Sequence, residues 1–270
     1  MKREDALAAF RSPNQSDYPE LAGYSRDEIY EDCLGGGALY LAAHMVRLMR
    51  LRPGDVVMDL GCGKGATSIF LARRFDVSVV AVDLWTPAQV LAERIARHGC
   101  RNRIVPLNLD ITERLPFAEG YFDGIFCMNS LSFYGGAKDF LGHLLNHLKQ
   151  GGEFCIGMES LTDEFTPAQL ADPPAVYNYR LPGGEDVWEG DFRKMHSPPW
   201  WERLFRDSGL LEVYHCAELP EAEILYEDLV LYEMEHDPHS DNIGRSIAQI
   251  EWGRQNRPAK TLFTLAARKL

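Results

Sequence analysis

Along this chain, short apolar runs typical of strands alternate with longer segments that are expected to be helices. Short apolar runs, which read as strands, occupy Val56–Met58, Val77–Asp83, a segment that begins at Ile104, Ile125–Met128 and Glu153–Glu159. Nearly continuous runs of this kind suit parallel strands that are buried on both faces. The segments between them, at 66–75, 87–98 and 137–149, are expected to be helices. Strands that alternate with helices through short turns predict an α/β fold, a parallel sheet with right-handed crossovers.

The rest of the chain flanks this alternation. Ser25 with Glu28 three places later is a capping-box pattern for a helix over 25–33, and a helix over 38–50 follows a run of glycines. Residues 160–197 fit no helical period and are rich in proline and glycine, so they read as an insertion. Then follow an expected helix over 197–209, a strand over 210–219, a helical insertion over 220–256 that breaks near 236–242, and a last strand over 261–269.

Composition places the chain among ordinary globular proteins. It has 270 residues, 46% hydrophobic and 25% charged, a length that suits one domain with insertions. Lysine and arginine number 28 against 40 acidic residues, a formal net charge of −12. This balance disfavours a nucleic-acid partner, whose phosphates would be repelled. The basic cluster Arg94, Arg97, Arg101 and Arg103 is interpreted as the solvated face of a helix and its following loop.

The six cysteines form no C-x-x-C pair. Cys62, Cys127 and Cys155 fall in or beside predicted strands, so they are interpreted as small buried residues in a reducing compartment. The N-terminal segment lacks the long apolar core of a signal peptide, and no apolar run approaches the ~20 residues of a membrane span. A cytoplasmic protein without stable membrane association is therefore expected.

The most informative segment is 56–65, VVMDLGCGKG, in which an apolar run leads into Asp59 and glycines follow at alternate positions. A strand, a glycine turn and a helix N-terminus bring backbone close to a nucleotide-like ligand, where a Cβ would block the approach. The spacing G-x-G-x-G differs from the G-x-G-x-x-G of dinucleotide enzymes, so no pyrophosphate is implied. An acid at this turn suits an ammonium group.

The motif D-L-G-C-G-K-G resembles the first motif of class I S-adenosylmethionine-dependent methyltransferases, and the resemblance covers residues 35–160 in full. It resumes more weakly at 198–216 and 260–268. The resemblance implies S-adenosylmethionine as cofactor and S-adenosylhomocysteine as product. The residues that it places around the methionine part are Asp59, Gly61, Cys62 and Gly63. The alternative is a glycine turn in another α/β protein.

The same resemblance implies further cofactor contacts. Asp83, at the end of the second strand, is expected to accept hydrogen bonds from the ribose hydroxyls, or else to cap the next helix. Leu84 and Trp85 follow it, beside the adenine or at the rim of the pocket. Asp110 is expected at the adenine amino group and the backbone of Ile111 at a ring nitrogen. The remaining predicted contacts are Gly36, Gly37 and Asn129, with a plain helix–helix turn as the alternative for the glycines.

The resemblance also implies the complete fold. It is a doubly wound, Rossmann-like sheet of about seven strands, the last one antiparallel, with helices on both faces. Within a single domain over 1–270, residues 1–50 are expected to form a helical cap and residues 51–160 the cofactor-binding core. Residues 160–197 and 220–256 are expected to be insertions that form a lid over the substrate.

Catalytic residues are harder to predict, because methyl transfer from a sulfonium is an in-line displacement that depends mainly on positioning. The segment after the fourth strand carries no histidine, so no general base is implied by the family. The candidates are Tyr134 in that segment, Glu159 at the end of the fifth strand and His196 at the end of the first insertion. The alternatives are packing at the pocket wall for Tyr134 and a surface loop for His196.

A metal site is not expected. His236, Asp237, His239 and Asp241 are close in sequence, but Pro238 breaks the helical geometry that would bring them together, so a turn is favoured. The sequence predicts a methyltransferase that acts on a small molecule, with a homodimer left open. The alternatives are modification of lipid acyl chains, a non-catalytic S-adenosylmethionine-binding module and, more distantly, a nicotinamide oxidoreductase.

Overall fold

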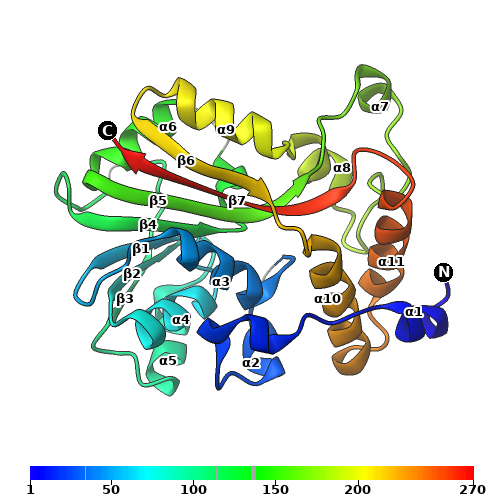
Figure 1. Cartoon of the computed structure of the whole chain (residues 1–270), viewed down its shortest axis with the longest axis horizontal. Coiled ribbons are helices and arrows are strands. Elements are labelled where there is room, and N and C mark those ends of the chain that lie inside the picture. Colours follow the sequence, from blue (N-terminus) through cyan, green and yellow to red (C-terminus); the bar gives the residue numbers. More distant parts are fainter. Residues whose placement is uncertain (34, 114, 135–137) are drawn as a thin grey trace.

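A seven-stranded sheet runs through the molecule in the order β3-β2-β1-β4-β5-β7-β6 (Figure 1). The computed structural model describes residues 1–33, 35–113, 115–134 and 138–270. Strands β1 to β5 are mutually parallel, whereas β7 is antiparallel to both β5 and β6. The predicted doubly wound sheet with an antiparallel last strand is therefore confirmed. The strands are β1 (Val56–Leu60), β2 (Ser78–Asp83), β3 (Ile104–Asn108), β4 (Phe122–Met128), β5 (Leu148–Leu161), β6 (Leu211–Glu218) and β7 (Lys260–Lys269).

Helices cover both faces of the sheet. Alternate strand residues point to opposite faces, and accordingly Val57 and Met58 belong to two different hydrophobic cores. The core around Val57 includes α3 (Ala38–Leu48), α4 (Ala66–Phe75) and α5 (Ala88–Arg97). The core around Met58 includes α6 (Lys138–Asn146) and α9 (Pro198–Asp207). The helix expected over 137–149 is shorter, because β5 already begins at Leu148.

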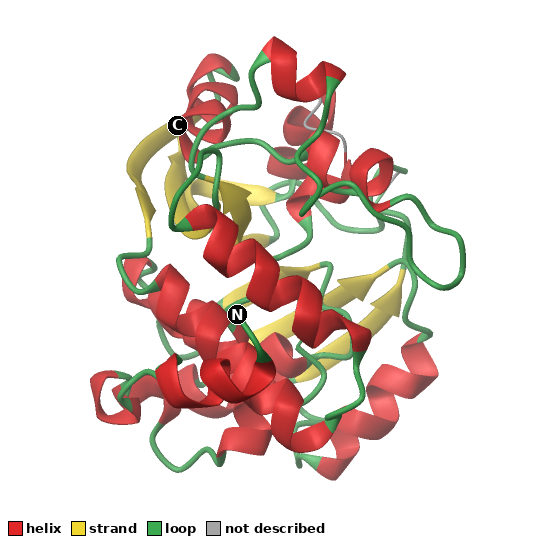
Figure 2. Cartoon of the chain, turned by 90° about the vertical axis from the view of Figure 1, so that its right-hand side faces the viewer, coloured by secondary structure: helices red, strands yellow, loops and turns green. Residues whose placement is uncertain are grey.

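The two segments predicted to be insertions lie at the end of the sheet where β5 ends and β7 begins, on the right in Figure 1. The second insertion forms α10 (Ala222–His236) and α11 (Asp241–Gly253), with the predicted break between them. The first contains short helical turns, α7 (Pro167–Ala171), α8 (Val187–Gly190) and η4 (Phe192–Lys194). Figure 2, which faces this end of the molecule, shows helices and loops in front of the strands.

The N-terminal segment contributes α1 (Arg3–Ala9), η1 (Gln15–Asp17), η2 (Pro19–Leu21) and α2 (Arg26–Tyr30). The capping box of α2 is formed as predicted, because Ser25 and Glu28 exchange hydrogen bonds between side chain and backbone. Helix α1 packs away from the sheet, where its Ala6 joins a separate apolar cluster with α10 and α11. The N-terminal segment is therefore bound to the second insertion.

One prediction about charge is wrong. Arg94 was expected on a solvated helix face, but it is only 4% exposed, and its guanidinium pairs with Asp32 of the N-terminal segment. Arg97 and Arg101 are exposed as expected. The difference arises because a distant segment covers this part of α5, which local periodicity does not reveal.

Two other expectations concern the cysteines and membrane spans. Cys62, Cys127 and Cys155 are buried and unpaired, which confirms that they are small core residues. Among the described residues, none of the helices has the length and apolar character needed to traverse a bilayer.

Candidate functional site

Three acidic residues lie at the carboxyl ends of the first three strands. Asp59 is the penultimate residue of β1, Asp83 is the last of β2, and Asp110 follows β3 by two residues. Because β1, β2 and β3 are neighbours in a parallel sheet, these ends meet at one edge. Ligands of open α/β sheets bind at this edge, so the three carboxylates define the candidate site.

The turn after β1 brings backbone close to this edge. Gly61, Gly63 and Gly65 all have positive φ, between 53° and 86°, a region that glycine tolerates best. A Cβ on Gly61 would lie 2.3 Å from the Cβ of Ser130, so no side chain fits there. The amides of Gly61 and Cys62 donate to the carbonyl of Val82, which anchors the turn to β2.

Asp59 lies beneath this turn and is 1% exposed. Its Oδ2 accepts hydrogen bonds from the hydroxyls of Thr67 and Ser68 at 2.6 and 2.5 Å. Its Oδ1 is buried and has no hydrogen-bond partner among the described residues. Burial raises the pKa of Asp59 to about 6, against the two hydroxyls, which lower it. A buried carboxylate oxygen without a partner suits a cationic donor from a ligand.

Asp83 has a different environment, because backbone amides surround it. Its Oδ2 accepts from the amide of Gly63 at 2.9 Å, and its Oδ1 accepts from Trp85 and Thr86 at 2.9 and 2.7 Å. The carboxylate therefore joins the glycine turn to the loop after β2. Trp85 is 70% exposed, and its ring meets the ring of Phe133 edge-on at 5.2 Å. Leu84 is also exposed.

Asp110 and Ile111 occupy the loop after β3. Asp110 accepts hydrogen bonds from the amide and the hydroxyl of Thr112 at 2.9 and 2.6 Å, which lower its pKa. The side chain of Ile111 is buried in the core that contains Leu131. The Ile111 side chain is thus a packing residue of this loop, and its predicted ligand contact concerns the backbone.

Asn129, Gly36 and Glu159 are joined in a closed ring of hydrogen bonds. The Gly36 amide donates to Glu159 Oε1 at 2.9 Å, and the Glu159 amide donates to Asn129 Oδ1 at 2.9 Å. Asn129 Nδ2 then donates to the Gly36 carbonyl at 3.2 Å. A Cβ on Gly36 would lie 2.5 Å from the ring of Tyr226. Gly37, which precedes α3, has φ 85°. The close Tyr226 ring thus favours glycine at position 36, and the positive φ favours it at position 37.

Comparison with known proteins relates the part of the chain that forms this edge of the sheet to methyltransferases. Residues 57–152 match the family described as "Methyltransferase domain". Phosphoethanolamine N-methyltransferase 3 of Arabidopsis thaliana is 39% identical over 183 residues, which cover 68% of this chain and 34% of that protein. The chain carries a class I S-adenosylmethionine-dependent methyltransferase domain. It spans about a third of the length of that curated relative.

Solved structures agree with this methyltransferase fold. A putative sarcosine dimethylglycine methyltransferase from Galdieria sulphuraria has a TM-score of 0.64 and 18% identity. The superposition covers 85% of this chain and 83% of that chain. The [4+2]-cyclase SpnF has a TM-score of 0.66 and 16% identity, with coverage of 96% and 98%. At these identities the similarity concerns the fold alone.

Two of the predicted catalytic residues, Tyr134 and His196, contact different side chains. Tyr134 stacks on Phe140, with its hydroxyl beside Gly61, and burial raises its pKa. His196 stacks on Trp200 at 3.8 Å, and its Nδ1 lies 2.9 Å from Glu164. The two side chains have different neighbours, and both remain predictions as catalytic groups.

The histidines and acids near the end of α10, where a turn was favoured over a metal site, include His236, which has ordinary partners. His236 Nε2 lies 3.0 Å from Asp27 Oδ1, and its Nδ1 bonds the Tyr232 carbonyl. Across the described part of the chain, no group of three or more His, Cys, Asp or Glu side chains is arranged to hold a metal ion.

Sequence reasoning missed two groups of residues at the site. Lys260 Nζ lies 3.2 Å from Glu159 Oε1 and 4.8 Å from the centre of the Tyr226 ring. Asp32 pairs with Lys64, a residue of the glycine motif, at 2.8 Å and also with Arg94. Both groups join segments far apart in sequence, so no local pattern signals them.

Proposed function

We propose that this protein transfers the methyl group of S-adenosylmethionine to a small acceptor molecule. The observation that carries the proposal is the buried Oδ1 of Asp59, which has no partner in the described part of the chain and lies beneath a glycine turn that admits no Cβ at Gly61. This arrangement suits the ammonium group of the methionine part, because the carboxylate can pair with a cation and the glycine turn lets the ligand approach the backbone closely. The small compounds for which two relatives are named, phosphoethanolamine and sarcosine, support a small acceptor.

The proposed cofactor contacts follow the strand ends. Asp59 would hold the ammonium group, and Gly36 and Gly37 at the start of α3 would approach the carboxylate. Asp83 would accept from ribose hydroxyls, although three amides already occupy part of its acceptor capacity. Asp110 and the Ile111 backbone would contact the adenine. S-adenosylmethionine supplies an activated methyl group, so these residues serve to bind and orient it.

The protein's own task is then to hold the acceptor in line with the methyl group and to exclude water. We propose that residues 160–197 and 220–256 form the lid on the acceptor side and that residues 1–50 cover the cofactor side. The support for the lid is the place of α7, α8, α10 and α11 beyond the end of β5 in Figure 1. The support for the cofactor side is the ion pair of Asp32 with Lys64 of the glycine motif. Glu159, at this end of β5, would then face the acceptor and Asn129 the cofactor.

The alternatives predict different products. Modification of acyl chains would place the methyl group or a methylene in extracted lipid. A non-catalytic module would bind the cofactor without transfer. A third alternative is a reaction other than methyl transfer, because SpnF, which is named a cyclase, has a similar fold.

The test is transfer of label from methyl-labelled S-adenosylmethionine into a fractionated cell extract. Label in a water-soluble small molecule supports the proposal, and the product mass then identifies the acceptor. Label in lipid would favour the acyl-chain alternative. Measured cofactor binding without label in any fraction would favour a binding module or a reaction other than methyl transfer.

A further inference from the structure

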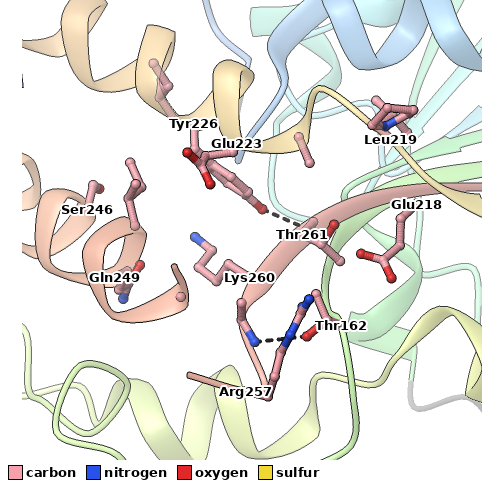
Figure 3. A pocket seen from close by; sticks show the side chains of 16 residues that line it. Thr162, Glu218, Leu219, Glu223, Tyr226, Ser246, Gln249, Arg257, Lys260 and Thr261 are labelled. Atoms are coloured by element: carbon pink, nitrogen blue, oxygen red, sulfur yellow. Dashed lines mark hydrogen bonds between the residues drawn. The ribbon is translucent and has the colours of Figure 1, made fainter. Parts of the chain in front are cut away.

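A cavity of about 310 Å³ lies between α10, α11 and the start of β7 (Figure 3). Its wall includes Tyr226 from α10, Gln249 from α11, and Arg257 and Lys260 from the chain that enters β7. Small-molecule sites occupy about 300–1,000 Å³, so this cavity suits a compact ligand.

Lys260 and Tyr226 line one wall of this cavity, and Glu159, which is not among the lining residues, pairs with Lys260 there. The Lys260 ammonium points into the open space in Figure 3, while it pairs with Glu159 Oε1 at 3.2 Å. The same ammonium lies 4.8 Å from the centre of the Tyr226 ring. Carboxylate and aromatic face together form a site for an ammonium group, and here the protein's own lysine occupies it.

This wall borders the proposed cofactor site. The oxygen of Glu159 that pairs with Lys260 also accepts the hydrogen bond from the Gly36 amide. The Tyr226 ring lies directly against Gly36, whose Cβ would be 2.5 Å from the ring. A ligand that entered between Lys260 and Glu159 would therefore lie next to the glycines at the start of α3.

The ion pair limits which ligands can enter. The side chains of Lys260 and Glu159 are only 19% and 24% exposed, so leaving either charge without a partner is costly. A ligand with only a positive charge would pair with Glu159 and release Lys260. A ligand with only a negative charge would pair with Lys260 and release Glu159. A ligand with both charges restores two ion pairs for the one that it breaks.

Arg257 adds a second cation to this cavity, whose lining also includes the carboxylates of Glu218 and Glu223. Among the described residues its guanidinium has no hydrogen bond or ion pair, and it lines the wall below Lys260 in Figure 3. An acidic group between Lys260 and Arg257 would meet two cations, whereas an ammonium group would meet Glu159 and the face of Tyr226. The Thr162, Ser246 and Thr261 hydroxyls also line the cavity and offer hydrogen bonds.

We propose that this cavity binds the acceptor and that the acceptor is a small zwitterion, an amine that also carries a phosphate or carboxylate group. Its ammonium end replaces Lys260 at Glu159 and Tyr226, and its acidic end binds Lys260 and Arg257. The inference rests on the proposed function, because it takes the cofactor to be bound at the neighbouring glycines.

Calorimetry with the full chain and S-adenosylhomocysteine tests this inference with two matched sets of probes. One set is phosphoethanolamine, ethanolamine and monoethyl phosphate; the other is β-alanine, propylamine and propionate. We expect the zwitterion of at least one set to bind tenfold or more tightly than both of its single-charge counterparts. If neither zwitterion exceeds its counterparts, although S-adenosylhomocysteine binds, the inference is overturned and the proposed function stands. Failure of S-adenosylhomocysteine to bind contradicts the proposed function itself.

Two variants give a sharper readout, because each should replace the preference for the zwitterion by a preference for one of the ligands with a single charge. Lys260→Met leaves the Glu159 and Tyr226 site open, so ethanolamine should bind more tightly and phosphoethanolamine at least tenfold more weakly. Glu159→Gln leaves Lys260 unpaired, so monoethyl phosphate should gain affinity. Lys149→Met, which removes a lysine from a pair with Asp123 outside the cavity, is the control and should change neither preference. A uniform loss of affinity for all probes would indicate a merely structural pair and would refute the inference.

Discussion

At the scale of single residues, two carboxylates at adjacent strand ends have opposite environments. Among the described residues, Asp59 has two hydroxyl donors on one oxygen and none on the other, and its burial raises its pKa to about 6. Asp83 accepts from three backbone amides. The first is therefore incompletely satisfied until a cation arrives, whereas the second already stabilises the turn. This contrast leads to different predictions for the two residues.

Cofactor affinity should depend on the ionisation of Asp59. Its pKa in the folded protein is raised to about 6, so the carboxylate that would bind an ammonium is mostly protonated at pH 5 and ionised at pH 7. We expect affinity for S-adenosylmethionine to rise by about tenfold over this range. Calorimetry on the wild type and Asp59→Asn measures this, and the variant should bind weakly at both pH values. Equal affinity of the wild type at pH 5 and 7 would exclude the ammonium contact.

The same shift has a consequence for stability without cofactor. Because the pKa of Asp59 is higher in the folded than in the unfolded protein, the folded state binds more protons between about pH 4 and pH 6. The free energy of unfolding should therefore fall as pH rises through this window, and Asp59→Asn should remove that part of the slope. Urea unfolding of both proteins at several pH values provides the measurement. An unchanged slope in the variant would contradict the raised pKa.

Asp83→Ala should weaken S-adenosylmethionine binding by roughly tenfold or more, as the loss of charge-assisted hydrogen bonds does. The variant should also melt at a lower temperature, since the amides of Gly63, Trp85 and Thr86 lose their acceptor. Calorimetry and thermal unfolding report the two effects separately. Glu212→Ala, at an acid on β6 with an exposed side chain, is the control. Unchanged cofactor affinity would disprove the ribose contact.

At the scale of elements, the turn between β1 and α4 decides where the site lies. It combines positive φ at three glycines with direct contact to Ser130, which follows β4. The Ser130 hydroxyl donates to the carbonyl of Leu60, the last residue of β1, at 2.7 Å. The turn is thus constrained both by its own backbone and by the next strand of the sheet.

Gly61→Ala should therefore destabilise the fold in two ways, through its positive φ and through a clash with Ser130. We expect a loss of about 2–4 kcal/mol in the free energy of unfolding, measured by urea denaturation. Gly99→Ala is the matched control, because Gly99 also has a positive φ but no described atom within 4 Å of an added Cβ. Its loss should be about 1 kcal/mol. Similar losses at both positions would show that contact with Ser130 contributes nothing.

At the scale of the whole molecule, buried acids of α10 hold the N-terminal segment in place. Asp228 is 1% exposed and accepts hydrogen bonds from Ser12, Arg26 and Tyr30. The adjacent Glu227 is fully buried and pairs with Arg11. Further along the segment, Asp32 binds Lys64 of the glycine motif. The N-terminal segment thus joins α10 to the glycine turn of the candidate site.

Asp228→Asn should loosen this connection, because Arg26 and two hydroxyls lose a charged acceptor. We expect a loss of about 1–3 kcal/mol, below the 3–5 kcal/mol of a fully buried pair, since the Arg26 side chain is 34% exposed. Hydrogen exchange should accelerate at residues 11–30 more than in the sheet, and cofactor release should quicken. Glu235→Gln is the control, since this carboxylate pairs with the same arginine but is 53% exposed. Equal exchange in both variants would rule out this role for Asp228.

Much of the architecture was predictable because the signals are local. The apolar runs identified the strands, the glycine motif located the turn after β1, and a break was expected between α10 and α11. Burial of Arg94 was missed because Asp32, its partner, is far away in sequence. The length of β5 was also missed, since the strand begins at Leu148, within the segment expected to be a helix, and pairs with β4 across an irregular register between Phe122 and Gly124.

The sequence by itself determined the order of the elements, the position of the glycine turn and the acids at the strand ends. These follow from hydrophobic periodicity and turn chemistry, which act over a few residues. Only the tertiary structure decided that Lys260 meets Glu159 and Tyr226 and that Asp32 meets Lys64. These contacts join residues from separate elements, and the free energy that stabilises them comes from packing and charge pairing in the assembled fold.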